Sequence, residues 1–233
     1  MNIIETIHQE LKQNIDQKYK QSEARLFKES RKVYGVSTPI VRNIGKKYWK
    51  EIKNKNKENV FRLSEELLSS GYHEPLIIAF QWASTCRKQY EKSDFGIFEK
   101  WLGKYVNNWS SCDDFCGGPL GSLVSDFPEL LPQVFQWTKS KNRWIRRASS
   151  VCLIYSLRRG KCLEEAFKTA DNLLLDQDDL VQKGYGWMLK EASNKFQKEV
   201  FEYVMRNKKN MTRIALRYAI EKLPDGMKKQ AMC

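Results

Sequence analysis

The chain has 233 residues, of which 41% are hydrophobic and 30% are charged, and its formal net charge is +13. This composition excludes an intrinsically disordered chain, and because no run of about 18 uncharged apolar residues occurs, no transmembrane helix is expected. The first residues, MNIIETIHQE, lack the basic, apolar and small-residue order of a signal peptide, so we expect a cytosolic protein.

Apolar residues follow a helical period from the N-terminus onward. Thr38-Pro39 predicts an N-cap followed by proline at the first helical position. The segment 60–68 has apolar residues at i, i+3, i+7 and i+8, and the segment 200–205 has them at i, i+1, i+4 and i+5. In the segment 214–223 the apolar residues cover one broad helical face. Gly and Pro residues separate the apolar runs, and no alternating run of Val, Ile and Thr indicates a strand. The sequence therefore predicts an all-α fold.

Four segments begin with polar or basic residues and continue into an apolar helix. Asp113, Arg147, Lys183 and Arg217 occupy equivalent places in them, and successive members are 34, 36 and 34 residues apart. This period is typical of solenoids built from helix pairs, in which equivalent positions line one surface. We therefore expect a HEAT-like helical-repeat solenoid, an α-α superhelix, as a single domain over residues 1–233. Coincidence among amphipathic helices is the alternative.

The positive charge is concentrated toward the C-terminus. Residues 141–233 contain 20 Lys and Arg against 11 Asp and Glu, whereas residues 1–140 contain 21 against 17. A basic C-terminal part indicates a polyanionic partner such as nucleic acid. A lysine-rich surface that only keeps the protein soluble is the alternative.

Cysteine spacing does not predict a metal centre. Cys112 and Cys116 are four residues apart and share one helical face, but tetrahedral coordination would need two further ligands. The two histidines, His8 and His73, are distant in the sequence. We expect all cysteines to be reduced, and we expect Cys112 and Cys116 to pack in the core.

The repeat-related segments place a defined set of side chains on the expected shared face. Its basic members could neutralise phosphates, and its tryptophans offer flat surfaces to a base or sugar. A lone carboxylate among cations would repel DNA phosphates, but it could stabilise an electron-poor centre, such as the oxocarbenium-like sugar that forms when a cationic alkylated base leaves. The set comprises Trp109, Asp113, Arg146, Arg147, Lys183, Trp187, Lys190 and Arg213.

Each of these residue types also has a purely structural interpretation. Trp109 and Trp187 could belong to the core, since tryptophan at helical spacing is more often buried than functional. Asp113 could be an acid that the helix dipole favours in the first turns. The pair Arg146-Arg147 could lie on a solvated face.

The motifs of the chain resemble the AlkD-type DNA alkylation-repair glycosylases, which are built from HEAT-like repeats. Two of them are the most specific, namely the Trp-x-x-x-Asp step at 109–113 and the Gly-Trp-x-Leu-basic-Glu step at 186–191. The motifs that carry the resemblance are YGVSTPIVR at 34–42, His73-Glu74, NWSSCDDF at 108–115, RWIRRA at 143–148, QKGYGWMLKE at 182–191 and MTRIALRYAIEKL at 211–223.

The resemblance implies a concave basic face that holds duplex DNA. It also implies hydrolytic removal of cationic bases such as 3-methyladenine and 7-methylguanine, without metal or cofactor and without full base flipping. Trp109 and Trp187 would pack against the backbone and sugar of the lesion, Asp113 would stabilise the developing cation and position water, and Arg147 would hold phosphate. We expect a monomer that acts at the nucleoid in the cytoplasm.

Two departures from the family pattern leave alternatives open. The family often has an acid directly after the first tryptophan, where this chain has Ser110, and the neighbouring Asp114 could be the catalytic acid instead of Asp113. The family often has arginine where this chain has Lys190, and lysine lacks the bidentate fork. Some relatives have the fold without base excision. A non-catalytic DNA-structure binder and a protein-binding repeat scaffold are therefore the alternative functions.

Overall fold

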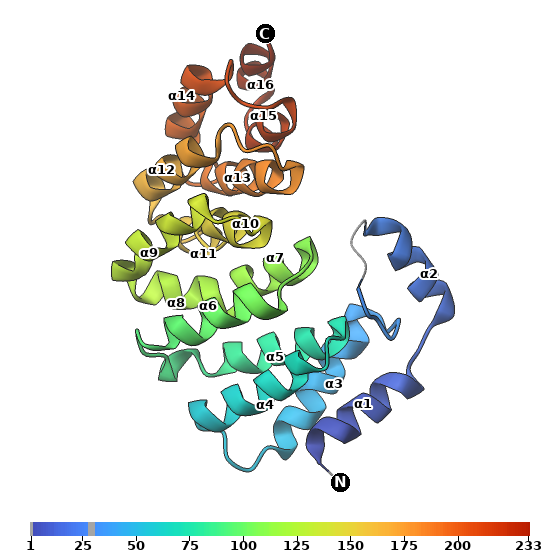
Figure 1. The fold of residues 1–233 in the computed structure, drawn as a ribbon. Helices are drawn as coiled ribbons and strands as arrows, with labels where there is room; N and C mark the ends of the chain where they lie inside the picture. Colours follow the sequence, from blue (N-terminus) through green and yellow to red (C-terminus); the bar gives the residue numbers. More distant parts are fainter. Residues whose placement is uncertain (1, 28–30) are drawn as a thin grey trace. The chain divides into compact units, whose positions relative to one another are not determined.

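The computed structural model describes residues 2–27 and 31–233, and these residues form an almost entirely helical fold. Within them no β-sheet occurs, although an isolated bridge pairs Lys32 with Tyr72. The predicted all-α class is confirmed (Figure 1). No helix of the described residues is long and apolar enough to cross a membrane.

The chain divides into two compact units, residues 1–119 and residues 120–233. A single repeat domain over residues 1–233 stays a prediction. The helices that begin in unit 1 are α1 (Ile3–Gln13), α2 (Gln17–Leu26), α3 (Thr38–Glu51), α4 (Lys57–Ser69), α5 (His73–Thr85), α6 (Asp94–Tyr105), α7 (Trp109–Gly117) and, at the boundary, α8 (Pro119–Asp126). The α-helices of unit 2 are α9 (Leu131–Gln136), α10 (Arg143–Val151), α11 (Ile154–Leu157), α12 (Leu163–Leu173), α13 (Asp179–Ala192), α14 (Gln197–Asn207), α15 (Arg213–Ala219) and α16 (Asp225–Met232). Short 3₁₀ turns lie at η1 (Arg87–Gln89), η2 (Pro128–Leu130) and η3 (Trp137–Lys139).

Six helices begin at nearly constant intervals along the chain. Helices α3, α5, α7, α10, α13 and α15 start at residues 38, 73, 109, 143, 179 and 213, so successive starts are 35, 36, 34, 36 and 34 residues apart. In unit 1, α5 packs against both α3 and α7, and in unit 2, α13 packs against both α10 and α15. Side-by-side packing of helices at this period confirms the predicted helical repeat.

Polar residues directly before the repeat helices fix where four of them begin. The side chains of Asn108, Asn142, Asp178 and Thr212 each accept a hydrogen bond from a backbone N–H of the first turn. Such N-caps satisfy N–H groups that have no partner inside the helix. The expected cap of α3 is wrong by one residue, because Ser37 holds the N-cap position and makes no side-chain hydrogen bond there.

Unit 1 has an aromatic core between its two layers of helices. Phe61 of α4 contacts Phe98 and Trp101 of α6, and Phe98 contacts Phe115 of α7. Phe115 in turn stacks on Phe80 of α5. All five rings are buried. Through Phe115, this core packs the repeat helix α7 against α5 and α6. Cys112 and Cys116 are also fully buried on α7, which confirms the expected core packing.

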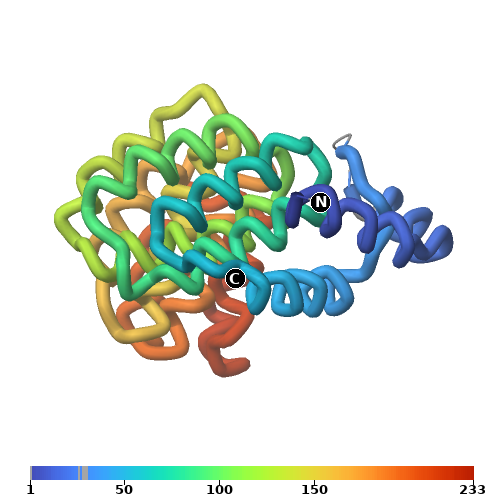
Figure 2. The backbone as a smooth tube through the Cα atoms, turned by 90° about the horizontal axis from the view of Figure 1, so that it is seen from below, coloured from blue at the N-terminus to red at the C-terminus, as the bar shows by residue number. Residues whose placement is uncertain are grey.

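A buried carboxylate holds the loop ahead of α3. Glu74, in the first turn of α5, accepts hydrogen bonds from the backbone N–H groups of Tyr34, Gly35 and Val36 at 3.0, 2.7 and 3.2 Å. Gly35 has φ +97°, a conformation that favours glycine. The motifs at 34–42 and at 73–74 are therefore parts of one tertiary contact. Figure 2 shows α1 and α2, in dark blue, at the side of this unit beside α3.

In unit 2 two glycines let α13 approach its neighbours closely. A Cβ atom on Gly186 would lie 2.8 Å from the carbonyl oxygen of Ala215 in α15. A Cβ atom on Gly184 would lie 3.2 Å from the side chain of Arg147 in α10. The Gly-Tyr-Gly sequence thus fixes how α13, and with it Trp187, is set against α10 and α15.

Candidate active site

The first predicted catalytic pair lies on α7 of unit 1. Trp109 is the first residue of α7, and Asp113 follows four residues later, which places both side chains on one face of the helix. Both residues are half-buried. The cap by Asn108, whose side chain accepts from the Ser111 backbone N–H at 2.9 Å, fixes this first turn.

The indole of Trp109 is stacked on an aromatic side chain from a distant part of the sequence. The ring of Phe27, which follows α2, lies parallel to the Trp109 ring, with 4.8 Å between centroids and an interplanar angle of 2°. The guanidinium carbon of Arg31 lies 3.3 Å from the centroid of the Phe27 ring. Phe27 has no signal in the sequence that predicts this contact, because no repeat period or motif spacing includes it.

The two adjacent acids of α7 have different surroundings. The Asp114 carboxylate accepts a hydrogen bond from the Arg42 guanidinium at 2.6 Å, and its second oxygen is buried without a hydrogen-bond partner. Burial raises the pKa of Asp114, and the positive charge and hydrogen bond of Arg42 offset this only in part. Asp114 is therefore engaged in a long-range contact to α3. The assignment of the catalytic role to Asp113 stays a prediction.

The second predicted tryptophan lies on α13 of unit 2 and is held by its own helix. The half-buried Trp187 donates its indole N–H to the Glu191 carboxylate at 3.0 Å. Glu191 also accepts from Arg158 at 2.9 Å. Burial alone would raise the pKa of Glu191, but the hydrogen bonds from Arg158 and Trp187 outweigh it and lower that pKa. Glu191 therefore stays ionised and fixes the orientation of the indole.

Three of the predicted phosphate-binding cations already have acidic partners. Arg146 pairs with Asp176 at 2.6 Å, Lys183 with Asp179 at 3.0 Å, and Lys190 with Glu221 at 2.7 Å. These pairs hold each cation in position, but they also neutralise its charge. In unit 2 the net positive charge on this set of residues is thus smaller than the sequence count suggests.

The other two predicted phosphate contacts differ sharply in exposure. Arg147 is 5% exposed, and its guanidinium donates a hydrogen bond to the backbone carbonyl of Leu180. Arg213 is exposed at the start of α15, and it makes no ion pair with any described residue. Arg213 is therefore the member of the set most available to solvent.

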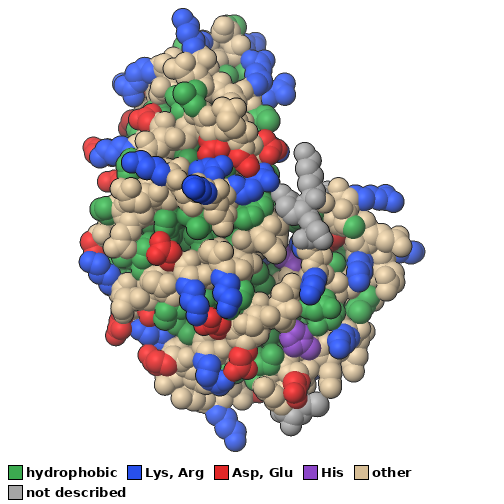
Figure 3. All heavy atoms as spheres, viewed as in Figure 1, with side chains coloured by type: hydrophobic (Ala, Val, Ile, Leu, Met, Phe, Trp, Pro, Cys, Tyr) green, Lys and Arg blue, Asp and Glu red, His purple; other side chains and the backbone are tan. Residues whose placement is uncertain are grey.

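The structure brings the predicted residues together in two groups. Unit 1 holds Trp109 and Asp113. Unit 2 holds the remaining residues on three helices, of which α13 packs against the other two: Arg146 and Arg147 on α10, Lys183, Trp187 and Lys190 on α13, and Arg213 on α15. That the two groups line one surface stays a prediction. Figure 3 shows Lys and Arg side chains over both units on the face in view, with Asp and Glu between them.

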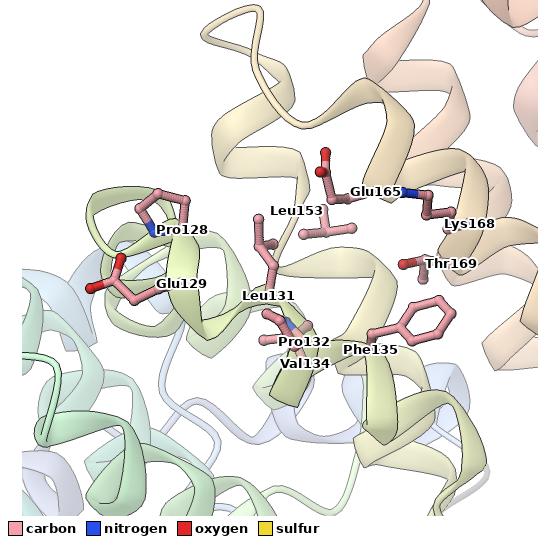
Figure 4. A pocket seen from close by; sticks show the side chains of 10 residues that line it. All are labelled: Pro128, Glu129, Leu131, Pro132, Val134, Phe135, Leu153, Glu165, Lys168 and Thr169. Atoms are coloured by element: carbon pink, nitrogen blue, oxygen red, sulfur yellow. The ribbon is translucent and has the colours of Figure 1, made fainter.

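An apolar pocket of about 380 Å³ lies in unit 2. Its walls come from the segment 128–135, from Leu153 and from α12, which contributes Glu165, Lys168 and Thr169 (Figure 4). None of the predicted site residues lines it. Within the described ranges, no group of three or more His, Cys, Asp or Glu side chains could hold a metal ion.

Comparison with known proteins agrees with the motifs and the fold. The family model described as DNA alkylation repair enzyme matches residues 7–223. A solved structure from Enterococcus faecalis, described as a predicted DNA alkylation repair enzyme, is similar with a TM-score of 0.78. It is 18% identical in sequence, and the alignment covers 91% of this chain and 98% of that chain. No curated protein matches the chain.

Proposed function

This chain belongs to the DNA alkylation repair enzyme family, and from that membership we infer that it is a monofunctional DNA N-glycosylase. The proposed substrates are cationic N3- and N7-alkylated purines in duplex DNA. The observation that carries the proposal is the pair of Trp109 and Asp113, one helical turn apart and half-buried at the start of α7. A carboxylate beside an aromatic surface is suited to a cationic sugar, whereas it has no evident use in a protein that only binds phosphates.

The chemistry requires little from the enzyme besides charge stabilisation and a placed water. The bond between C1′ and the purine nitrogen breaks, and its electron pair leaves with the base, which thereby becomes neutral. Because the leaving base is already cationic, no general acid is needed. Asp113 stabilises the oxocarbenium-like sugar and orients the water whose oxygen bonds to C1′, while the proton of that water passes to Asp113 or to solvent.

The tryptophans and cations have positioning roles in this proposal. Trp109 and Trp187 pack against the sugar and backbone of the lesion nucleotide, so that the reaction proceeds without full flipping of the base. The orientation of Trp187 that Glu191 fixes supports such a role. The protein is proposed to act as a monomer at the nucleoid, with no cofactor. The proposed phosphate contacts are Arg146, Arg147, Lys183, Lys190 and Arg213.

The test is incubation of the protein with duplex DNA that has been methylated, followed by chromatography of the released bases. We expect free 7-methylguanine and 3-methyladenine, and none from unmethylated duplex. A parallel binding measurement on the same duplex separates loss of binding from loss of chemistry. A protein that binds the duplex and releases no base would instead be a non-catalytic DNA-structure binder. The departures from the family pattern at Ser110 and Lys190 favour that second candidate.

A further inference from the structure

A small polar pocket lies in unit 1 beside the Trp109 group of residues. It has a volume of about 100 Å³. Its walls come from the loop at 31–32, the junction of α4 and α5, the C-terminal end of α6 and the loop that leads into α7. The lining residues that matter chemically are Arg31, Lys32, Tyr72, His73, Lys104 and Asn108.

The pocket wall has a net positive charge. Arg31, Lys32 and Lys104 contribute three cations, and none of the described residues that line the pocket is acidic. Glu23 pairs with Arg31 at 3.0 Å and offsets its charge, so Lys32 and Lys104 supply the net positive charge of the wall. Glu74 instead accepts hydrogen bonds from three backbone N–H groups of the loop at 34–36. An anion would therefore be attracted to this pocket.

His73 provides the second, independent observation. The residue is 7% exposed, and its Nδ1 is buried without a hydrogen-bond partner. A buried polar atom without a partner costs about 1–3 kcal/mol, so such atoms in native proteins usually have a function or a bound partner. Burial and the nearby charge of Arg31 lower the pKa of His73 to about 3, which leaves a neutral imidazole in a cationic wall. A neutral imidazole can donate one N–H to an anion oxygen.

Two links connect residues of the pocket wall to Trp109. Arg31 lies against one face of Phe27, and Phe27 stacks on Trp109. Asn108 lines the pocket and directly precedes Trp109, whose helix it caps. A group bound in this pocket would thus lie beside the surface that the proposed function gives to the lesion nucleotide.

We propose that this pocket binds one phosphate group. Guanidinium and ammonium groups with a neutral imidazole donor are suited to its oxygens and its charge. Position favours the backbone of duplex DNA as the source of that phosphate, and in this form the proposal rests on the proposed function. Free orthophosphate shares the same chemistry and is the other source that an experiment must distinguish.

The test observes His73 directly by NMR. The chain has two histidines, so imidazole ¹H–¹⁵N spectra of the full-length protein contain few signals, and His8→Gln assigns them. One titration uses sodium phosphate against sodium chloride at matched ionic strength. A second uses an undamaged DNA duplex. We expect the duplex to shift the His73 signals and orthophosphate to shift them at higher concentration.

Lys104→Ala tests whether this cation of the pocket wall contributes to phosphate binding, and Lys100→Ala is a matched control from the same helix. Lys100 lies one turn earlier and pairs with Glu65 at 2.8 Å. Lys104→Ala should weaken duplex binding roughly threefold, flatten its salt dependence by about one phosphate and reduce the His73 response. Lys100→Ala should leave the His73 response intact.

The outcomes separate this proposal from the proposed function. His73 signals that respond to neither titrant, while the duplex binds, would overturn the phosphate site. A response to orthophosphate alone keeps the site and assigns it to a free phosphate source. A response to the duplex without release of methylated bases keeps the site and removes the glycosylase activity. Release of methylated bases without any shift of the His73 signals removes the phosphate site and keeps the glycosylase activity.

Discussion

Trp109 in unit 1 and Trp187 in unit 2 differ in how far along the sequence the residues lie that contact each indole. Phe27 stacks on Trp109 from 82 positions earlier in the chain, and the neighbouring Asp114 reaches Arg42 in α3. Trp187 instead donates its N–H to Glu191, one turn along the same helix. One tryptophan is therefore held by tertiary structure and the other mainly by its own helix.

This difference predicts which substitutions act at a distance. Around Trp109, a change in the segment between α2 and α3 alters the proposed site although it is remote in sequence. Around Trp187, the local pair with Glu191 persists as long as α13 is helical. The cations do not follow this division, because Arg31 in unit 1 pairs with Glu23 just as Lys190 in unit 2 pairs with Glu221.

The largest expected effect follows from Asp113→Asn. This change keeps size and polarity but removes the charge that would stabilise the sugar cation, so base release should fall roughly ten- to a thousandfold, or about 1.4–4 kcal/mol of barrier. Duplex affinity should stay constant or rise slightly, since a negative charge near phosphates is lost. Single-turnover release of 7-methylguanine measures the effect.

Asp114→Asn is the matched control for that experiment. Asp114 is held by Arg42 and its pKa is raised by burial, so its replacement should leave base release near that of the parent. If Asp114→Asn abolished release while Asp113→Asn did not, the catalytic acid would be the neighbouring residue. In that case the catalytic carboxylate would itself be positioned by a tertiary contact, the hydrogen bond from Arg42 of α3.

His73 should make the stability of unit 1 depend on pH. Its pKa in the folded protein is lowered to about 3 by burial and by Arg31, below the ordinary value of 6.5. The stability that this contributes is present above pH 6.5 and is lost as the pH falls toward 3, at about 1.4 kcal/mol per pH unit. Urea unfolding of the parent and of His73→Gln between pH 7 and pH 4, in buffers without phosphate, measures the difference. Parallel curves for the two proteins would contradict the prediction.

Paired replacements of the two supports compare the tryptophans directly. Phe27→Leu removes the stacked ring, and because an aromatic pair contributes about 0.5–1.5 kcal/mol beyond burial, base release should fall roughly two- to tenfold. Glu191→Gln keeps a carbonyl oxygen that accepts from the Trp187 N–H, so release should fall by less than about twofold. Equal losses in the two variants would show that the local and the tertiary support matter alike.

The sequence predicts the repeat much better than it predicts contacts across the repeat. The helix period depends on local chemistry, and the structure has helices over all four segments that the sequence predicts around Asp113, Arg147, Lys183 and Arg217. The contact between Phe27 and Trp109 has no periodic signature, because Phe27 lies outside the repeating helices. The acidic partner of Lys190 has no such signature either, because Glu221 follows α15 and contacts Lys190 only through the packing of α13 on α15.

The smallest expected effect concerns single phosphate contacts in unit 2, measured as the slope of the logarithm of duplex affinity against the logarithm of salt concentration. Arg213→Ala and Arg147→Ala should each weaken binding at all sequences and flatten this slope by about 0.9. Lys198→Ala is the matched control, because Lys198 lies exposed on α14, outside the repeat helices, and should change the slope less.

Arg147 is buried against Leu180, so thermal unfolding of the Arg147→Ala protein must first show an intact fold. A folded Arg147→Ala protein with unchanged affinity and slope would place Arg147 off the DNA face. Its remaining role would then be to join α10 to α13 through its hydrogen bond to Leu180. The phosphate contacts of unit 2 would in that case come from exposed cations such as Arg213.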